Sequence, residues 1–415
     1  MIKILAHQCF TPGIMTVKTW IREGSRSDPS TKKGLHQLCG SVLSRGCGPY
    51  GTIEVADLIE GCGASLRSET HEDGLLISLK CSTEEHTKLL PLIGWMIASP
   101  HLEPDQIDLE RELCIQVLKR QIESPFHLAF NSWRELVYSK TPYGHDPCGT
   151  VDDLLNITHK DIQNIANMLL LRPKVIVLEG ALPVTIEDYI QTLKPFKTLS
   201  DSCTESSIVQ SNNHLYSQGS KQNRIVLNSQ KTSQIIIIFG KETIPHSNLD
   251  DLKLRILSCY LGSGMSSLLF KKLREEKGLV YDVGTYHPIR EYNTPFAIHA
   301  STTETKARLT LEIIIKSWNK LINEELSHDD LKLAKAKLKG NYAHNSQTIS
   351  QRAERKAQLL GYNMDEDHDS KCIKRIDSIT SQEINRAAQK HLRNPCLSLC
   401  GPKSSIDELA LNWRY

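Results

Sequence analysis

The chain has 415 residues, of which 39% are hydrophobic and 24% charged, a composition typical of globular proteins with large cores. Its 50 basic and 48 acidic side chains leave a net charge of +2, which gives no electrostatic reason to expect nucleic acid or an anionic membrane as a partner. No apolar run approaches the roughly 18 residues of a membrane-spanning helix, and the first residues lack the features of a targeting peptide. We therefore expect a cytoplasmic protein of two or three domains.

The first functional candidate in chain order is a helix predicted within GLHQLCGSVLSRG, residues 34–46. It places His36 three residues before Cys39 and four before Gly40. The zinc-binding helix of one class of peptidases reads H-x-x-E-H, so only the first His of that pattern is present here. The segment is either a dismantled metal site, a different site, or an ordinary buried helix.

Two alternative chemistries for this helix have little support. A metal held by His36 and Cys39 would need further ligands such as Cys47, Cys62 or His71, whose spacing matches no recognisable pattern. A Cys–His nucleophilic pair has no local signature either. The acidic stretch DEDHDS, residues 365–370, could attract a cation, but its simplest interpretation is a solvated acidic loop.

The chain also contains an internal repeat. Residues 157–180 and 379–402 align without gaps at an offset of 222, which is 379 minus 157. In both copies a threonine, Thr158 or Thr380, precedes a helical pattern and has a carboxylate three positions later, the pattern of a capping box. A proline and a short apolar strand follow each helix. The repeat predicts two similar domains of roughly 200 residues each.

The segment between the two repeats is polar and poor in periodic apolar residues. We predict an N-terminal domain over 1–200, a linker over 201–223 and a C-terminal domain over 224–415. Strands and long helices occur in separate clusters within each half, which favours α+β layers in two domains related by duplication.

The most specific motif is LGSGMSSLLFKKLREEKGLVYDVGTYHP, residues 261–288. It predicts a helix with Met265, Leu268, Leu269 and Leu273 on its apolar face, ended by Gly278 and followed by an alternating strand. Arg274 and Tyr281 lie seven residues apart on this helix and strand.

This motif resembles the C-terminal domain of the insulinase–pitrilysin metallopeptidases, in the branch of the processing peptidases. VKTWIREGSRSDP, YSKTPYGHDPCGTVDDL and both repeats extend the resemblance over essentially the whole chain. It implies paired α+β domains that form half of a clam-shell around a cavity. It also implies that Arg274 and Tyr281 reach the zinc site of another domain and bind the carbonyl of the peptide to be cleaved.

The same resemblance identifies the opening helix as a degenerate zinc site. Family members with activity use two His ligands and a Glu base, and here Cys39 replaces the Glu and Gly40 the second His, beside His36. The third ligand follows the pattern E-R-x5-E, in which Glu110 fits the first Glu and Val117 takes the ligand position. The base and two of three ligands are therefore missing, and we expect no metal at this site.

We interpret the chain as the non-catalytic subunit of a heterodimeric zinc metalloendopeptidase that cleaves unfolded peptides or presequences. The zinc and an intact H-x-x-E-H are expected in a sibling subunit, and this chain needs no cofactor of its own. The alternatives are a purely structural homologue, like the peptidase-related core proteins of a respiratory complex, and a self-sufficient hydrolase with altered chemistry.

Overall fold

A computed structural model describes residues 2–139, 141–202, 224–411 and 413. The predicted linker over 201–223 lies outside the described residues, apart from its first two. Two compact units are present, and they do not follow the order of the chain. The first comprises Met1–Lys119, His145–Leu215 and Asn345–Glu366, and the second comprises Arg120–Gly144, Tyr216–His344 and Asp367–Tyr415.

The first unit is built on a five-stranded sheet in the order β1-β5-β2-β4-β3. β1 and β5 are parallel, and the other neighbours are antiparallel. The strands are β1 (Ile2–Gln8), β2 (Ile14–Ile21), β3 (Ser65–Thr70), β4 (Leu75–Ser82) and β5 (Lys174–Gly180). The helices are α1 (Leu35–Val42), α2 (Thr52–Gly61), α3 (His86–Ala98), α4 (Pro104–Ile122), α6 (Val151–Asn156), α7 (His159–Leu171), α8 (Ile186–Thr192), α9 (Lys194–Ser202) and α13 (Ile349–Gly361).

The second unit repeats this topology with the strand order β6-β10-β7-β9-β8. β6 and β10 are parallel, and the remaining pairs are antiparallel. The strands are β6 (Ile225–Ser229), β7 (Gln234–Glu242), β8 (Val280–Tyr286), β9 (Pro295–Thr303) and β10 (Cys396–Gly401). The helices are α5 (Pro125–Tyr138), α10 (Asp251–Gly262), the π-helical segment η4 (Phe270–Glu275), α11 (Glu304–Asn323), α12 (His328–His344), α14 (His368–Ile376), α15 (Ser381–His391) and α16 (Lys403–Leu411).

The expected duplication is confirmed at the level of individual caps. Thr158 is the N-cap of α7 and Thr380 the N-cap of α15, and each threonine forms a capping box with the acidic residue three positions later. Each helix then leads into the strand that pairs with the first strand of its sheet, β5 or β10. The α+β fold class predicted from the sequence is therefore correct.

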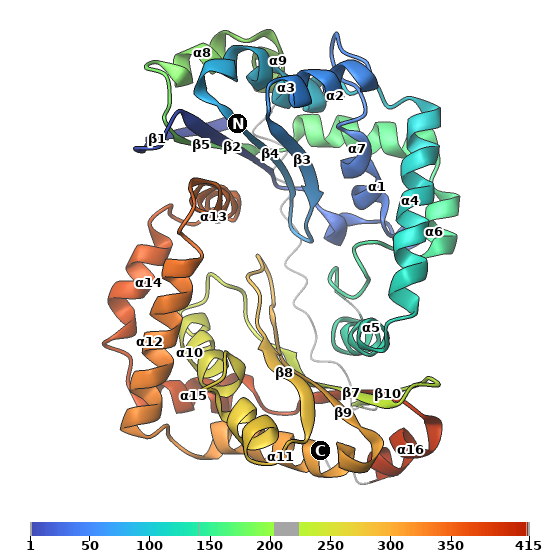
Figure 1. Cartoon of the computed structure of the whole chain (residues 1–415), viewed down its shortest axis with the longest axis vertical. Coiled ribbons are helices and arrows are strands. Elements are labelled where there is room, and N and C mark those ends of the chain that lie inside the picture. The colour runs from blue at the N-terminus through green and yellow to red at the C-terminus, as the bar shows by residue number, and fades with distance from the viewer. Residues whose placement is uncertain (1, 140, 203–223, 412, 414–415) are drawn as a thin grey trace. The chain divides into compact units, whose positions relative to one another are not determined.

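Each half of the chain gives one helix to the sheet of the other unit. α13, from the C-terminal half, packs on β2 and β5 of the first unit, and α5, from the N-terminal half, packs on β6, β7 and β10 of the second (Figure 1). In each unit most of the other helices lie on the opposite side of the sheet and enclose a large apolar core with it. In the described part of the chain, no helix is both long and apolar enough to cross a lipid bilayer.

Candidate functional site

The start of α1 is organised by one buried carboxylate. Asp28 accepts hydrogen bonds from the backbone N–H groups of Gly34, at 2.8 Å, and His36, at 3.0 Å. Gly34 has φ = 87°, a left-handed conformation that favours glycine. Asp28 therefore satisfies N–H groups at the first turn of α1, which would otherwise lack partners.

The same carboxylate binds the ring of His36. Nδ1 of His36 lies 2.6 Å from Oδ1 of Asp28, and Nε2 lies 3.5 Å from Oε1 of Glu23. Glu23 is also paired with Arg172, and Asp28 lies 3.3 Å from Nε2 of His145. The side chains of His36, Asp28 and Glu23 are at most 3% exposed. This cluster, which we call the His36 charge network, is thus closed to solvent.

These contacts decide the charge of His36. Burial by itself would lower the pKa of His36, but its interactions with Asp28 and Glu23 raise the pKa to about 9. Burial would likewise raise the pKa of Asp28, yet its hydrogen bonds to His145 and His36 lower it below the usual value. His36 is therefore a cation at neutral pH. Because a metal binds the neutral imidazole, the network opposes the role of zinc ligand.

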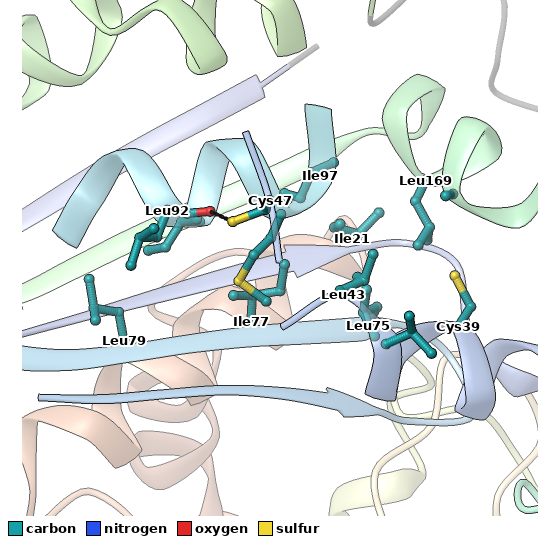
Figure 2. Packing of buried hydrophobic residues seen from close by; sticks show 14 of the residues in the cluster. Ile21, Cys39, Leu43, Cys47, Leu75, Ile77, Leu79, Leu92, Ile97 and Leu169 are labelled. Atoms are coloured by element: carbon teal, nitrogen blue, oxygen red, sulfur yellow. Dashed lines mark hydrogen bonds between the residues drawn. The ribbon is translucent and has the colours of Figure 1, made fainter. Parts of the chain in front are cut away.

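Cys39 faces the core, on the same helix. It has no exposed surface, and its Sγ lies 4.0 Å from the carbonyl oxygen of Ile162. Figure 2 shows the side chain among Leu75 and Leu169 in the core of the first unit. Burial raises the pKa of the thiol to about 12, so Cys39 is neutral at physiological pH. A neutral, enclosed thiol is neither a general base nor an activated nucleophile.

Position 40, which the resemblance aligns with the second His ligand, has no room for a side chain. A Cβ atom added to Gly40 would lie 2.4 Å from Oγ1 of Thr70 and 2.9 Å from Cδ1 of Leu75. Thr70 is held in place because its hydroxyl donates a hydrogen bond to the carbonyl of His36 at 3.1 Å. The sheet residues thus occupy the space that a ligand at position 40 would require.

The segment that matches E-R-x5-E lies on α4. Glu110 is 7% exposed and forms an ion pair with Arg45. Val117 is 39% exposed and carries no group that can bind a metal. Glu110, the one carboxylate that fits the motif, therefore forms a structural ion pair.

Arg274 and Tyr281 are brought together in the second unit. Arg274 lies in the last turn of η4, and its Nη1 donates a hydrogen bond to the backbone carbonyl of Tyr281 at 2.7 Å. Tyr281 occupies an irregularity of the β8–β9 ladder, between the paired residues Val280 and Asp282. Both side chains are exposed, Tyr281 by 62%. β-Bulges commonly redirect a side chain beside a functional site.

The predicted helix before Arg274 is shorter than expected. Gly278 ends it as predicted, with φ = 56°, and Leu269 and Leu273 are buried. Met265, however, is 73% exposed, because it lies in a turn before the helical residues begin at 268. Met265 therefore does not belong to the apolar face.

Two groups of neighbouring side chains could not be linked from the sequence alone. Glu23 and Asp28 lie 13 and 8 residues before His36, and no local periodicity links them to it. In the stretch over 365–370, the solvated loop is correct for residues 365–367, which are exposed and outside any helix, whereas His368 and Asp369 begin α14 and are half-buried.

Two family models match the chain. The model of the insulinase family, peptidase family M16, matches residues 10–150, and that of the "peptidase M16 inactive domain" matches residues 185–338. A Helicobacter pylori protein named "Non-peptidase homolog YmxG" is 24% identical over 374 residues, which cover 89% of this chain and 84% of the relative. A Rickettsia felis protein named "Uncharacterized zinc protease" is 21% identical over 343 residues, covering 80% and 78%.

A solved structure shows the same fold. The crystal structure of a peptidase M16 inactive domain from Pseudomonas fluorescens superimposes with a TM-score of 0.85 at 19% identity, over 96% of this chain and 95% of that one. One of these relatives is named a non-peptidase and the other a zinc protease, so the names do not agree on whether such chains are active.

Proposed function

The chain belongs to the insulinase family, peptidase family M16, and on this premise we propose that it is the non-catalytic subunit of a two-subunit zinc metalloendopeptidase. The sibling subunit supplies the zinc ion, its ligands and the Glu base. This chain supplies Arg274 and Tyr281 to the peptide carbonyl, together with part of the surface that encloses the substrate. The substrates are unfolded peptides or presequences.

The observation that carries the proposal is a contrast between the two units. In the first unit His36 is tied to Asp28 and Glu23, and Gly40 is closed off by Thr70. In the second unit Arg274 remains exposed beside Tyr281. The positions that would bind zinc are therefore occupied by buried structural contacts. The side chains that would bind a peptide carbonyl are exposed to solvent.

The geometry of Arg274 suits that role. A guanidinium has five N–H donors, and the bond to the Tyr281 carbonyl uses one while fixing the direction of the others. The phenol of Tyr281 is a second donor close by in the chain. Two oriented donors can stabilise a carbonyl oxygen that gains negative charge as a peptide bond is attacked.

An exposed apolar stripe on α4 supports a binding surface in the first unit. Leu109, Leu113 and Val117 are spaced four residues apart, and each is about 40% exposed. Side chains at this spacing share one face of a helix. The stripe includes the position of the lost third ligand, so we assign it to contact with the peptide or the sibling subunit.

The proposal is tested by reconstituting the pair. The chain is purified alone and together with a sibling from the same organism that has an intact H-x-x-E-H, and cleavage of unfolded peptides is measured. We expect no cleavage by the chain alone and cleavage by the pair. Arg274→Ala and Tyr281→Phe should each lower kcat/KM of the pair on the order of a hundred- to a thousandfold.

Lys277→Ala is the matched control, because Lys277 is an exposed cation three residues beyond Arg274 and has no assigned role. It should leave cleavage unchanged. If the pair is active but insensitive to Arg274→Ala and Tyr281→Phe, the chain acts only as a scaffold. Cleavage by the isolated chain would instead show a self-sufficient hydrolase.

A further inference from the structure

The second unit contains a group of metal-ligating side chains that the proposed function does not use. His246 lies in the segment between β7 and α10, and His368 and Asp369 are the first two residues of α14. One ligand atom from each of the three lies within 4.8 Å of the other two. His246 is 3% exposed, and His368 and Asp369 are half-buried. We propose that His246, His368 and Asp369 bind a divalent transition-metal ion of the zinc type.

The spacing of the donor atoms is close to what such an ion needs. Imidazole nitrogens and carboxylate oxygens bind zinc at about 2.0–2.2 Å, which places tetrahedral ligand atoms roughly 3.3–3.6 Å apart. The ligand atoms of His246, His368 and Asp369 lie within 4.8 Å of one another, so small side-chain rotations, without backbone movement, would bring them to this spacing. The rings of His246 and His368 already lie with their centroids 5.0 Å apart, inclined at 67°.

A buried carboxylate orients His246 for this role. Oδ2 of Asp251 lies 2.7 Å from Nδ1 of His246, and Oδ1 lies 3.0 Å from Nε2 of His287. Arg255 donates from Nε to the same carboxylate at 2.6 Å. A carboxylate bound to Arg255 accepts hydrogen bonds, so the 2.7 Å contact places the proton of His246 on Nδ1.

This protonation state makes Nε2 the nitrogen of His246 that binds a metal. Metal-binding histidines characteristically donate their other ring N–H to a carboxylate, which fixes the tautomer and strengthens the ligand. Asp251 is 2% exposed and begins α10, so it is held rigidly. His246 is therefore oriented as a ligand by Asp251 before any metal binds.

The ligand set also indicates the class of metal. Two imidazoles and one carboxylate are typical of zinc and related divalent ions, whereas calcium and magnesium prefer oxygen ligands alone. Three protein ligands leave at least one coordination position for water or a neighbouring group. Cys372, one turn further along α14, has its Sγ 3.3 Å from Nε2 of His368.

Binding would join two separate segments of the second unit. The segment before α10 contributes His246, and the start of α14 contributes the other two ligands. α14 follows directly after the chain passes from the first unit to the second, between Glu366 and Asp367. The ion would thus link the first turn of α14, where the chain re-enters the second unit, to the segment before α10.

The experiment uses the full chain, stripped of metal with a chelator and titrated with Zn(II). Metal content after gel filtration and calorimetry should give one bound zinc per chain, with a rise in Tm. His368→Ala and Asp369→Asn should each weaken binding about tenfold or more and remove the rise in Tm. Both residues are half-buried at a helix start, so their variants are expected to fold, which circular dichroism without metal verifies.

His328→Ala and Asp367→Asn are the controls. His328 is an exposed histidine at the start of α12, and Asp367 is the exposed acid directly before the cluster. Both variants should bind zinc like the native chain. The proposal is overturned if the native chain binds no zinc, or if His368→Ala and Asp369→Asn retain its affinity, because thiols elsewhere would then hold the ion. Neither readout involves a partner or a peptide, so this test and that of the proposed function fail separately.

Discussion

Asp28 holds His36 twice, through the backbone N–H at 3.0 Å and through ring Nδ1 at 2.6 Å. One carboxylate therefore positions the first turn of α1 and fixes the charge of the histidine on it. With Glu23 on the other side of the ring, His36, which the resemblance aligns with a zinc ligand, is the cation of a buried charge network.

This network predicts a specific pH dependence of stability. The pKa of His36 is raised from its ordinary 6.5 to about 9 in the folded chain, so its contribution is complete below pH 6.5 and is lost as pH rises through 9. The pKa values of Asp28 and Glu23 are lowered, so their contributions are present above their ordinary values of 3.8 and 4.5 and are lost at lower pH. Stability from the network is therefore greatest between about pH 4.5 and 6.5.

His36→Gln tests this dependence. Between pH 6.5 and 9.5 the native chain should lose up to about 3 kcal/mol of unfolding free energy relative to the variant, measured by urea unfolding at each pH. Any pH-independent effect of the substitution on stability drops out, because only the slopes of unfolding free energy against pH are compared. Parallel curves for the two proteins over this range would refute a protonated His36.

Gly40→Ala tests whether the second ligand position is closed. An alanine inside a helix is normally favoured over glycine by about 0.5–1 kcal/mol. Here the added Cβ would meet Thr70 and Leu75, so we expect a loss of about 1–3 kcal/mol of unfolding free energy. Gly61→Ala, at the end of α2 with open space around the Cβ position, is the control and should not be destabilising. Equal effects of the two substitutions would contradict the closed position.

Gly361→Ala tests the packing of α13 on the first unit. Gly361 ends α13, and a Cβ there would lie 2.2 Å from Cδ1 of Trp20 on β2. We expect faster amide hydrogen exchange across α13 and a stability loss of about 1–3 kcal/mol. Gly340→Ala on α12, where no atom lies within 4 Å of the Cβ position, should change neither quantity adversely. Unchanged exchange in α13 would show that the helix does not depend on this contact.

Several features followed from the sequence because their causes are local. The capping boxes at Thr158 and Thr380 need only a threonine and an acid three residues apart, so the repeat predicted two like domains correctly. Gly278 was identified from its place after a helical pattern, and its positive φ agrees. The absence of a Glu at position 39, a His at 40 and a Glu at 117 is a matter of residue type, so the expectation of an incomplete zinc site needs only the sequence and the resemblance.

The sequence by itself therefore determined the fold class, the duplication and the incomplete ligand set. Only the tertiary structure decided what took the place of that set, because His36 is paired across a loop with Asp28 and Glu23 by contacts that leave no periodic signal. The exchange of α5 and α13 between the sheets was hidden for the same reason. An amphipathic pattern requires a helix to bury one face, but the sheet that receives it is chosen by long-range packing.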